Sequence, residues 1–115
     1  MKEDKLIIEE DDFLVRIFLS ENEKYNHTSL YEYIVLKCKE MGIAGATVLR
    51  GIMGYGADRR LHTSKILDLS DNLPIIIEII DKEENIAKLK PYLDEVIHKG
   101  FVTIERIHVI KYRNK

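Results

Sequence analysis

The chain has 115 residues, of which 45% are hydrophobic and 33% charged; this composition excludes a disordered chain and fits one domain. Its formal net charge of -2 excludes a general attraction for nucleic acid or an anionic membrane, so any anion site must be local. One cysteine excludes an internal disulfide, and no apolar run reaches the ~20 residues of a membrane span or resembles a signal peptide. We therefore expect a single cytoplasmic domain, residues 1–115, that is not embedded in a membrane.

The first half of the sequence predicts a strand, a helix and a second strand. Residues 1–11 are mostly charged, and we interpret them as a loosely held segment before the fold. Residues 13–20 are rich in β-forming apolar side chains and predict a strand. Residues 28–42 carry apolar side chains at helical spacing and predict a helix, and residues 43–50 predict the next strand.

The ends of this first helix carry recognisable signals. Ser29 and Glu32 match a capping box. In this motif the serine side chain accepts a hydrogen bond from the backbone N–H three residues on, and the glutamate side chain accepts one from the backbone N–H of the serine. Gly42 can take the left-handed conformation that closes a helix.

The second half repeats the order after a long connection, residues 51–72. Residues 73–80 are almost wholly β-branched and predict a strand. Residues 81–100 predict a helix with a kink or break at Pro91 and a closing glycine, Gly100. Residues 101–112 alternate apolar and polar side chains, as expected of a half-buried strand.

This βαββαβ order predicts an α+β, ferredoxin-like fold, in which an antiparallel four-stranded sheet carries both helices on one face. The strands at 13–20 and 73–80 are apolar on both faces, and two helices can cover only one of them. Self-association would cover the second face. The alternative is that the N-terminal segment or the long connection folds back over it.

The long connection carries the candidate site, because structureless connections beyond about 12 to 15 residues are usually functional or disordered. Glycine backbone can approach an anion closely, and arginine donates forked hydrogen bonds to phosphate or carboxylate. An exposed tyrosine there favours contact with a partner. The candidate ligand-binding residues are Arg50, Gly51, Gly54, Tyr55, Gly56, Arg59, Arg60, His62 and Lys65. A solvated loop without a ligand explains the same residues.

Other chemistry finds less support in the sequence. A second polar cluster, Lys24, Tyr25 and His27, precedes the first helix and is interpreted as a solvated turn or a weak anion site. The four histidines and Cys38 show no metal-ligand spacing, so no metal site is predicted. No GxSxG elbow or activated nucleophile is found, so no catalytic residue is assigned and we expect no enzyme.

The segments AGATVLRGIMGYG, HTSKILDLSDNLPIIIEIID and KGFVTIERIHVIKY resemble an uncharacterised prokaryotic family of the PII-like (GlnB-like) signalling superfamily. The resemblance covers nearly everything from residue 13 to 112. It implies a ferredoxin-like homotrimer in which residues 51–72 correspond to the T-loop, the segment that docks onto a transporter, channel or enzyme and responds to nucleotide. It also shows a departure: the Gly- and Lys-rich phosphate loop of PII proteins is here only HKG, residues 98–100.

The leading hypothesis is a trimeric regulator that binds a small anion, with an adenine nucleotide as its effector and no certain cofactor, and that controls a transporter or enzyme through the long loop. Two alternatives stay open. One is a metal-responsive trimer resembling the CutA proteins, and the other is a hydrolase that uses the loop cations to stabilise charge.

Overall fold

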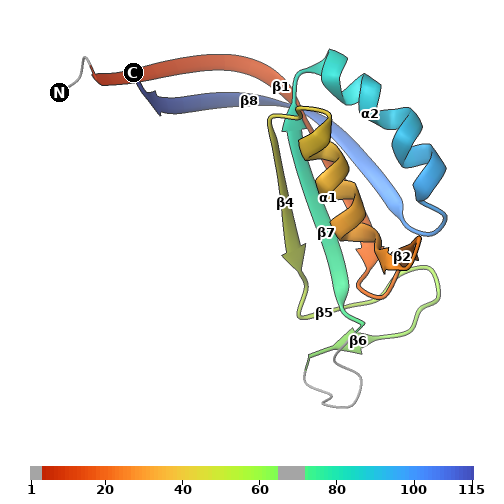
Figure 1. The fold of residues 1–115 in the computed structure, drawn as a ribbon. Coiled ribbons are helices and arrows are strands. Elements are labelled where there is room, and N and C mark those ends of the chain that lie inside the picture. Colours follow the sequence, from red (N-terminus) through yellow and green to blue (C-terminus); the bar gives the residue numbers. More distant parts are fainter. Residues whose placement is uncertain (1–3, 65–71) are drawn as a thin grey trace.

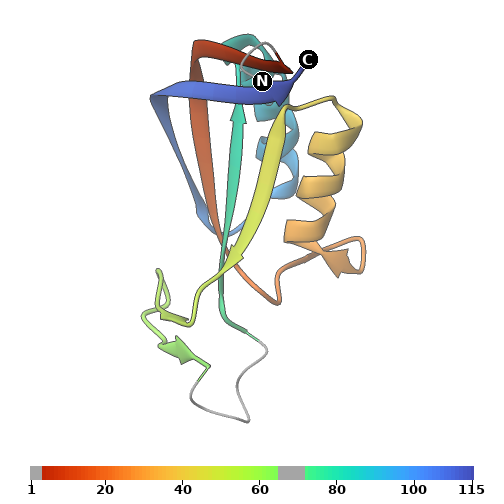
Figure 2. The ribbon, with the colours of Figure 1, turned by 90° about the vertical axis from the view of Figure 1, so that its left-hand side faces the viewer.

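The computed structural model describes residues 4–64 and 72–115. Its main sheet has four antiparallel strands in the order β4-β7-β1-β8. These strands are β4 (Gly45–Arg50), β7 (Pro74–Asp81), β1 (Lys5–Ser20) and β8 (Phe101–Asn114). Helices α1 (Leu30–Glu40) and α2 (Glu83–Val96) lie side by side against one face of this sheet (Figures 1 and 2). The predicted ferredoxin-like α+β fold is confirmed.

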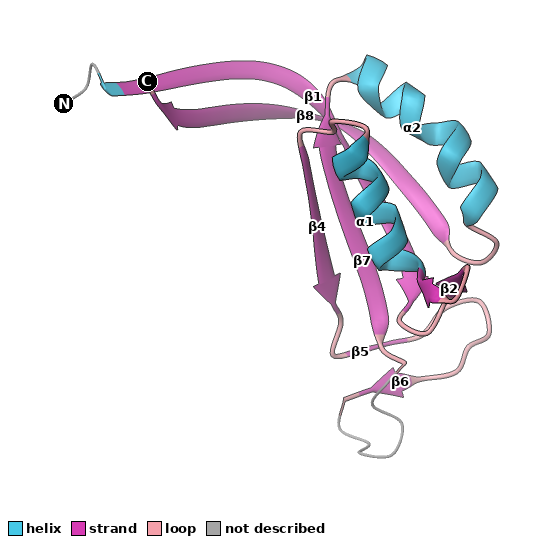
Figure 3. Ribbon diagram, viewed as in Figure 1, coloured by secondary structure: helices cyan, strands magenta, loops and turns pink. Residues whose placement is uncertain are grey.

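Two short hairpins accompany the main sheet. The strands β2 (Lys24–Tyr25) and β3 (Thr28–Ser29) pair just before α1, and β5 (Met53–Gly54) pairs with β6 (His62–Thr63) inside the long connection. Figure 3 shows the second hairpin below the sheet, at the end opposite the chain termini. Within residues 4–64 and 72–115, neither helix is long and apolar enough to cross a membrane.

The core lies between the helices and the inner face of the sheet. Its fully buried side chains alternate along the central strands, with Ile17 and Ile77 both at 0% exposure. The remaining buried aliphatic residues come from the same strands and both helices: Val15, Leu19, Leu30, Ile34, Ile75, Ile79, Ile86, Leu89, Leu93 and Val96. Every second side chain of a strand points to the same face of the sheet, and every third or fourth side chain of a helix points to the same side of the helix. The core is formed where these two apolar surfaces pack together.

Much of the outer face of the sheet is left uncovered by the described residues. Phe18 and Phe101 stack there with ring centroids 4.5 Å apart, and Phe101 remains 59% exposed. In the middle of the face Arg16 joins three strands: its Nε donates to Glu78 at 2.9 Å and its Nη1 to Glu105 at 2.7 Å. Residues 5–12 do not fold back over this face. The β5–β6 hairpin meets one end of it, where hairpin residues line a cavity together with Phe18, Ile76 and Phe101.

The prediction that residues 1–11 precede the fold is wrong for residues 5–11. Strand β1 begins at Lys5, and its first eight residues pair with the end of β8, from Lys5 opposite Asn114 to Asp12 opposite Ile107. The partner strand lies about a hundred positions away in sequence, so local composition could not reveal the pairing. Residues 101–112 are also not half-buried in this chain, because β8 is an edge strand whose apolar side chains lie largely in solvent.

Two predictions about helix ends, and the predicted break at Pro91, need correction. Ser29 is the N-cap residue of α1, but its side chain makes no capping hydrogen bond. Helix α2 continues through Pro91 without a break, and of the two predicted effects only a kink stays a prediction. It ends at Val96, so Gly100 belongs to the turn before β8 and does not close the helix. Gly42, with φ of 77°, does follow α1 in the expected left-handed conformation.

Candidate ligand-binding site

The first part of the long connection is an ordered hairpin fixed to the start of β7. The Gly51 N–H donates to the Pro74 carbonyl at 2.8 Å, and the Ser64 N–H donates to the Ile52 carbonyl at 3.0 Å. A Cβ on Gly54 would lie 3.0 Å from Pro74 Cγ, and one on Gly51 would lie 3.1 Å away. These glycines therefore allow the hairpin to pack closely on the proline ring.

An ion pair with Glu21 holds Arg50 at the base of the connection. Its Nε lies 2.9 Å from Glu21 Oε2, and its Nη2 donates to Glu21 Oε1 at 3.0 Å. The same Oε1 accepts from the backbone N–H of Leu73 at 3.1 Å. Arg50 thus links the end of β4 to the turn after β1 and holds both ends of the connection together.

The hairpin, the ends of two central strands and the turn before β8 enclose a cavity of about 290 Å³. Its walls are residues 18–20, 53–58, 62, 74–76 and 99–101. They combine the aromatic rings of Phe18, Tyr55 and Phe101 with backbone at Gly54 and Gly56. The cavity can therefore offer an apolar or stacking surface, and it has no side chain beyond Cα at the two glycine positions.

Gly100 sets the position of the turn at this cavity. Its φ of 133° is a conformation that side chains rarely allow, and a Cβ there would collide with the Phe18 carbonyl oxygen. Glycine is therefore required for the turn to approach β1 so closely. The consequence is that Lys99 and Phe101 both reach the cavity wall.

Charges of both signs line the cavity. The Arg60 N–H donates to Asp58 Oδ1 at 3.0 Å, and this hydrogen bond lowers the pKa of Asp58. The nearby charges of Lys99 and His62 lower that pKa further. Asp58 is therefore an anion at neutral pH, and its charge acts on the same cavity wall as that of Lys99.

The structure divides the residues predicted from sequence into three groups. Gly54, Tyr55, Gly56 and His62 line the cavity. Arg50 and Gly51 make the contacts that hold the base of the connection, the first with Glu21 and the second with Pro74. Arg59 and Arg60 are exposed at the hairpin tip and do not belong to the cavity wall. Lys65 lies outside the described residues.

The sequence reading missed Phe18, Asp58, Lys99 and Gly100 as site residues. The available signal was the short HKG segment, residues 98–100, which occupies the place of a phosphate loop and contains both a cation and a glycine. Its proximity to the connection follows from the pairing of Phe18 with Phe101 across β1 and β8.

The described residues hold no group of three His, Cys, Asp or Glu side chains arranged for a metal ion. Cys38 is buried between the helices and the sheet, and burial raises the pKa of its thiol to about 11. It is therefore an apolar core residue and a poor nucleophile or ligand.

The family model DUF190, described as "Uncharacterized ACR, COG1993", matches residues 13–109. The UPF0166 protein MJ1524 of Methanocaldococcus jannaschii is 43% identical over 99 residues, which cover 85% of this chain and 91% of that protein. A UPF0166 protein of Aquifex aeolicus is 41% identical over 99 residues, covering 84% and 91%.

Solved structures share the fold at lower identity. CPII, a nitrogen regulatory PII-like protein from Thiomonas intermedia K12 bound to ADP, AMP and bicarbonate, has a TM-score of 0.63 at 20% identity, covering 89% of this chain and 91% of CPII. The GlnK–ATP complex of B. subtilis has a TM-score of 0.54 at 12% identity, covering 84% and 82%. CutA1 of Oryza sativa also has a TM-score of 0.54, at 11% identity, covering 86% and 80%. The chain therefore belongs to the DUF190 (UPF0166) family and has the fold of the PII-like proteins.

Proposed function

We propose that this protein is a PII-like regulator that binds an anionic ligand, an adenine nucleotide in the first place, in the cavity beneath the β5–β6 hairpin. The observation that carries this proposal is the cavity wall itself, which joins the long connection to the turn that holds Lys99. PII-like neighbours bound to ADP, AMP or ATP support the choice of ligand class.

The wall offers a different group to each part of a nucleotide. Lys99 and the backbone near Gly54 and Gly56 suit a phosphate, because a cation and closely approaching N–H groups favour an anion. The rings of Tyr55 and Phe101 suit a flat base, since base–aromatic stacking contributes about 1–3 kcal/mol per base.

The small cavity beside the uncovered sheet face fits assembly with further copies of the chain, which we propose to be a homotrimer. Its volume of about 290 Å³ lies at the lower limit of small-molecule sites, which span roughly 300–1,000 Å³. Phe18 and Phe101 belong both to the cavity wall and to the uncovered outer face of the sheet. A second subunit packed on that face would therefore cover the apolar patch and enlarge the cavity into a cleft between subunits.

The proposed output is a change in the long connection, residues 51–72. A ligand held between Lys99 and the hairpin would stabilise one hairpin position, and a partner that binds this position would be favoured. Ile52, Met53 and Leu61 are each more than half exposed on the hairpin and suit an apolar contact with a transporter, channel or enzyme.

Isothermal titration calorimetry with ATP, ADP, AMP, bicarbonate, phosphate, Zn²⁺ and Cu²⁺ tests the ligand, with sedimentation velocity reporting the number of subunits. Lys99→Ala should weaken binding of the nucleotide about 10- to 100-fold, because a hydrogen bond to a charged group contributes about 1.5–3 kcal/mol. Asp58→Asn should strengthen it, because a negative charge on the cavity wall that would repel the phosphates is removed. The matched control is Lys88→Ala on the exposed side of α2.

Equal affinity in all three variants would show that the nucleotide binds elsewhere. Binding of Zn²⁺ or Cu²⁺ alone, lost in His62→Ala, would replace the proposal with the metal-responsive alternative. A monomer at every concentration would contradict the proposed trimer.

A further inference from the structure

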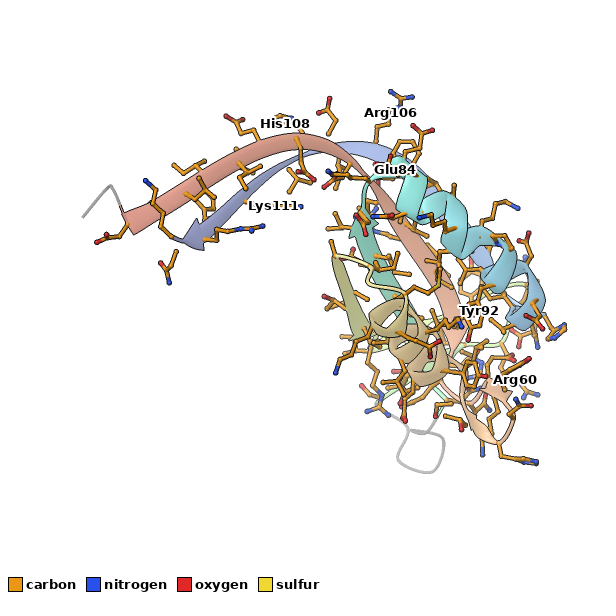
Figure 4. All side chains as sticks on the ribbon, turned by 45° about the horizontal axis from the view of Figure 1, so that its top comes forward. Arg60, Glu84, Tyr92, Arg106, His108 and Lys111 are labelled. Carbon is orange, nitrogen blue, oxygen red and sulfur yellow. The ribbon has the colours of Figure 1, made fainter. Side chains whose placement is uncertain are left out.

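The sheet continues into a two-stranded ribbon beyond the body of the molecule. Strand β7 pairs with β1 from Phe13 onward, whereas β8 pairs with β1 from Lys5. The β1–β8 ribbon, residues 5–12 and 107–114, is therefore only two strands wide. Figures 1 and 4 show it bending away from the helices, with both chain ends near its tip and with His108 and Lys111 on it, far from Arg60.

This ribbon exposes apolar side chains. Ile7 and Tyr112 are register partners at 55% and 63% exposure, and Ile110 is 46% exposed. Alternation along the strands places these three side chains on one face. An isolated two-stranded ribbon is at best marginally stable in water, so such a surface gains stability when a further strand or face covers it.

Both long edges of the ribbon lack a neighbouring strand among the described residues. The β1 edge has lost β7 at this point, and β8 is the outermost strand of the sheet. Unpaired edges carry free backbone N–H and C=O groups and are templates for pairing with another chain.

The two strands carry opposite charges. Strand β1 contributes four consecutive carboxylates, residues 9–12, whereas β8 contributes Lys111 and Arg113 and is followed by Lys115. Inside the chain, Lys111 Nζ lies 3.0 Å from Glu10 Oε2, the His108 ring lies 2.9 Å from both Glu9 and Asp11, and Asp12 is buried. The two side chains that share His108 remain largely exposed, so Glu9 and Asp11 are the carboxylates that β1 presents to another copy. If both edges carried charges of the same sign, two copies would repel each other. Here the β1 edge is acidic and the β8 edge is basic, so the β1 edge of one copy can attract the β8 edge of another.

We propose that the β1–β8 ribbon is an assembly arm that pairs edge to edge with the ribbon of a second copy of this chain. The acidic β1 edge of one copy lies against the basic β8 edge of the next, which keeps the strands antiparallel and the charges complementary. Each copy offers one edge of each kind, so the contact is heterologous and can close into a ring. The contact extends the trimer of the proposed function but requires no ligand.

Two substitutions in the 115-residue chain test the arm without ligand. Arg113→Glu reverses a charge on the β8 edge and removes no hydrogen bond or ion pair within the described residues. Ile7→Asp places a charge on the exposed apolar face. The matched controls are Lys88→Glu on α2 and Leu36→Asp on α1, since Leu36 is as exposed as Ile7, at 55%.

Native mass spectrometry and sedimentation equilibrium should show association at least tenfold weaker in both ribbon variants and unchanged in both controls. Hydrogen exchange should show the amides of residues 4–12 and 106–115 exchanging more slowly in the assembled protein than after dilution to single chains, in which only the pairing within the ribbon protects them. Unchanged exchange in peptides of α1 and β7 verifies that each variant is folded.

A stable trimer whose ribbon amides exchange freely would overturn the arm and leave the proposed trimer in place. Association unaffected by either ribbon substitution would also overturn it. Failure to bind any nucleotide would contradict only the proposed ligand, because assembly is measured without one.

Discussion

Gly100→Ala should be strongly destabilising and should also open the candidate site. The residue has a φ of 133°, and a Cβ there would collide with the carbonyl oxygen of Phe18. This oxygen belongs to the backbone of a central strand, so it cannot move aside as a flexible side chain would. The turn must therefore shift away from β1 and take Lys99 with it.

The expected loss combines two costs. A backbone conformation that is rare for residues with a side chain costs about 1–3 kcal/mol, and inserting a group into a packed position costs about 1–3 kcal/mol more. The sum is about 2–6 kcal/mol. This is a large part of the roughly 6–17 kcal/mol expected for a chain of 115 residues.

Urea unfolding followed by circular dichroism, at equal protein concentrations, measures the loss. With a slope of about 1–3 kcal/mol per molar urea, a loss of 3 kcal/mol lowers the midpoint by about 1–3 M. Gly56→Ala is the control, because a Cβ there meets nothing within 4 Å, and it should change stability by less than about 0.5 kcal/mol. A midpoint for Gly100→Ala within error of that control would refute the close approach of the turn to β1.

Three further predictions concern titratable groups. The Asp11 and Glu9 carboxylates raise the pKa of His108. The ion pairs of His108 therefore stabilise the fold below about pH 6.5, and this stabilisation is lost as the pH rises through the raised pKa. His108→Gln should remove this pH dependence of the unfolding midpoint. Burial raises the pKa of Asp12, so the native state loses stability as the pH rises above about 4. Asp12→Asn should therefore stabilise the protein at pH 7 but not at pH 3. An equal change in stability at both pH values would contradict this prediction. Cys38 is 1% exposed and should react with a thiol reagent only after denaturation, whereas rapid labelling of folded protein would exclude the described core.

Local patterns in the sequence predicted most elements of the fold. The β-branched run of β7 and the helical spacing of α1 are signals within one segment, so they needed no knowledge of the rest of the chain. The doubled βαβ order then restricted the arrangement to a ferredoxin-like sheet. Apolar residues on both faces of the central strands correctly indicated a second apolar face that the two helices leave uncovered.

The candidate site was predicted in part, for the same reason. Gly54, Tyr55, Gly56 and His62 follow one another in one unusual segment, and they do line the cavity. Lys99 reaches that cavity from far along the chain, where its own neighbours form an ordinary turn. Only the contact of Gly100 with the Phe18 backbone reveals why that turn lies there.

The sequence by itself determined the main strands and helices, their order, and the long connection that contributes residues 53–58 and 62 to the cavity wall. Each of these is encoded by the type and spacing of neighbouring side chains. Only the tertiary structure decided that Lys5 begins a strand and that Lys99 faces the hairpin. Both depend on the pairing of β1 with β8, from Lys5 opposite Asn114 to Phe18 opposite Phe101. Hydrogen bonds between strands so distant in sequence leave no periodic signal in either strand alone.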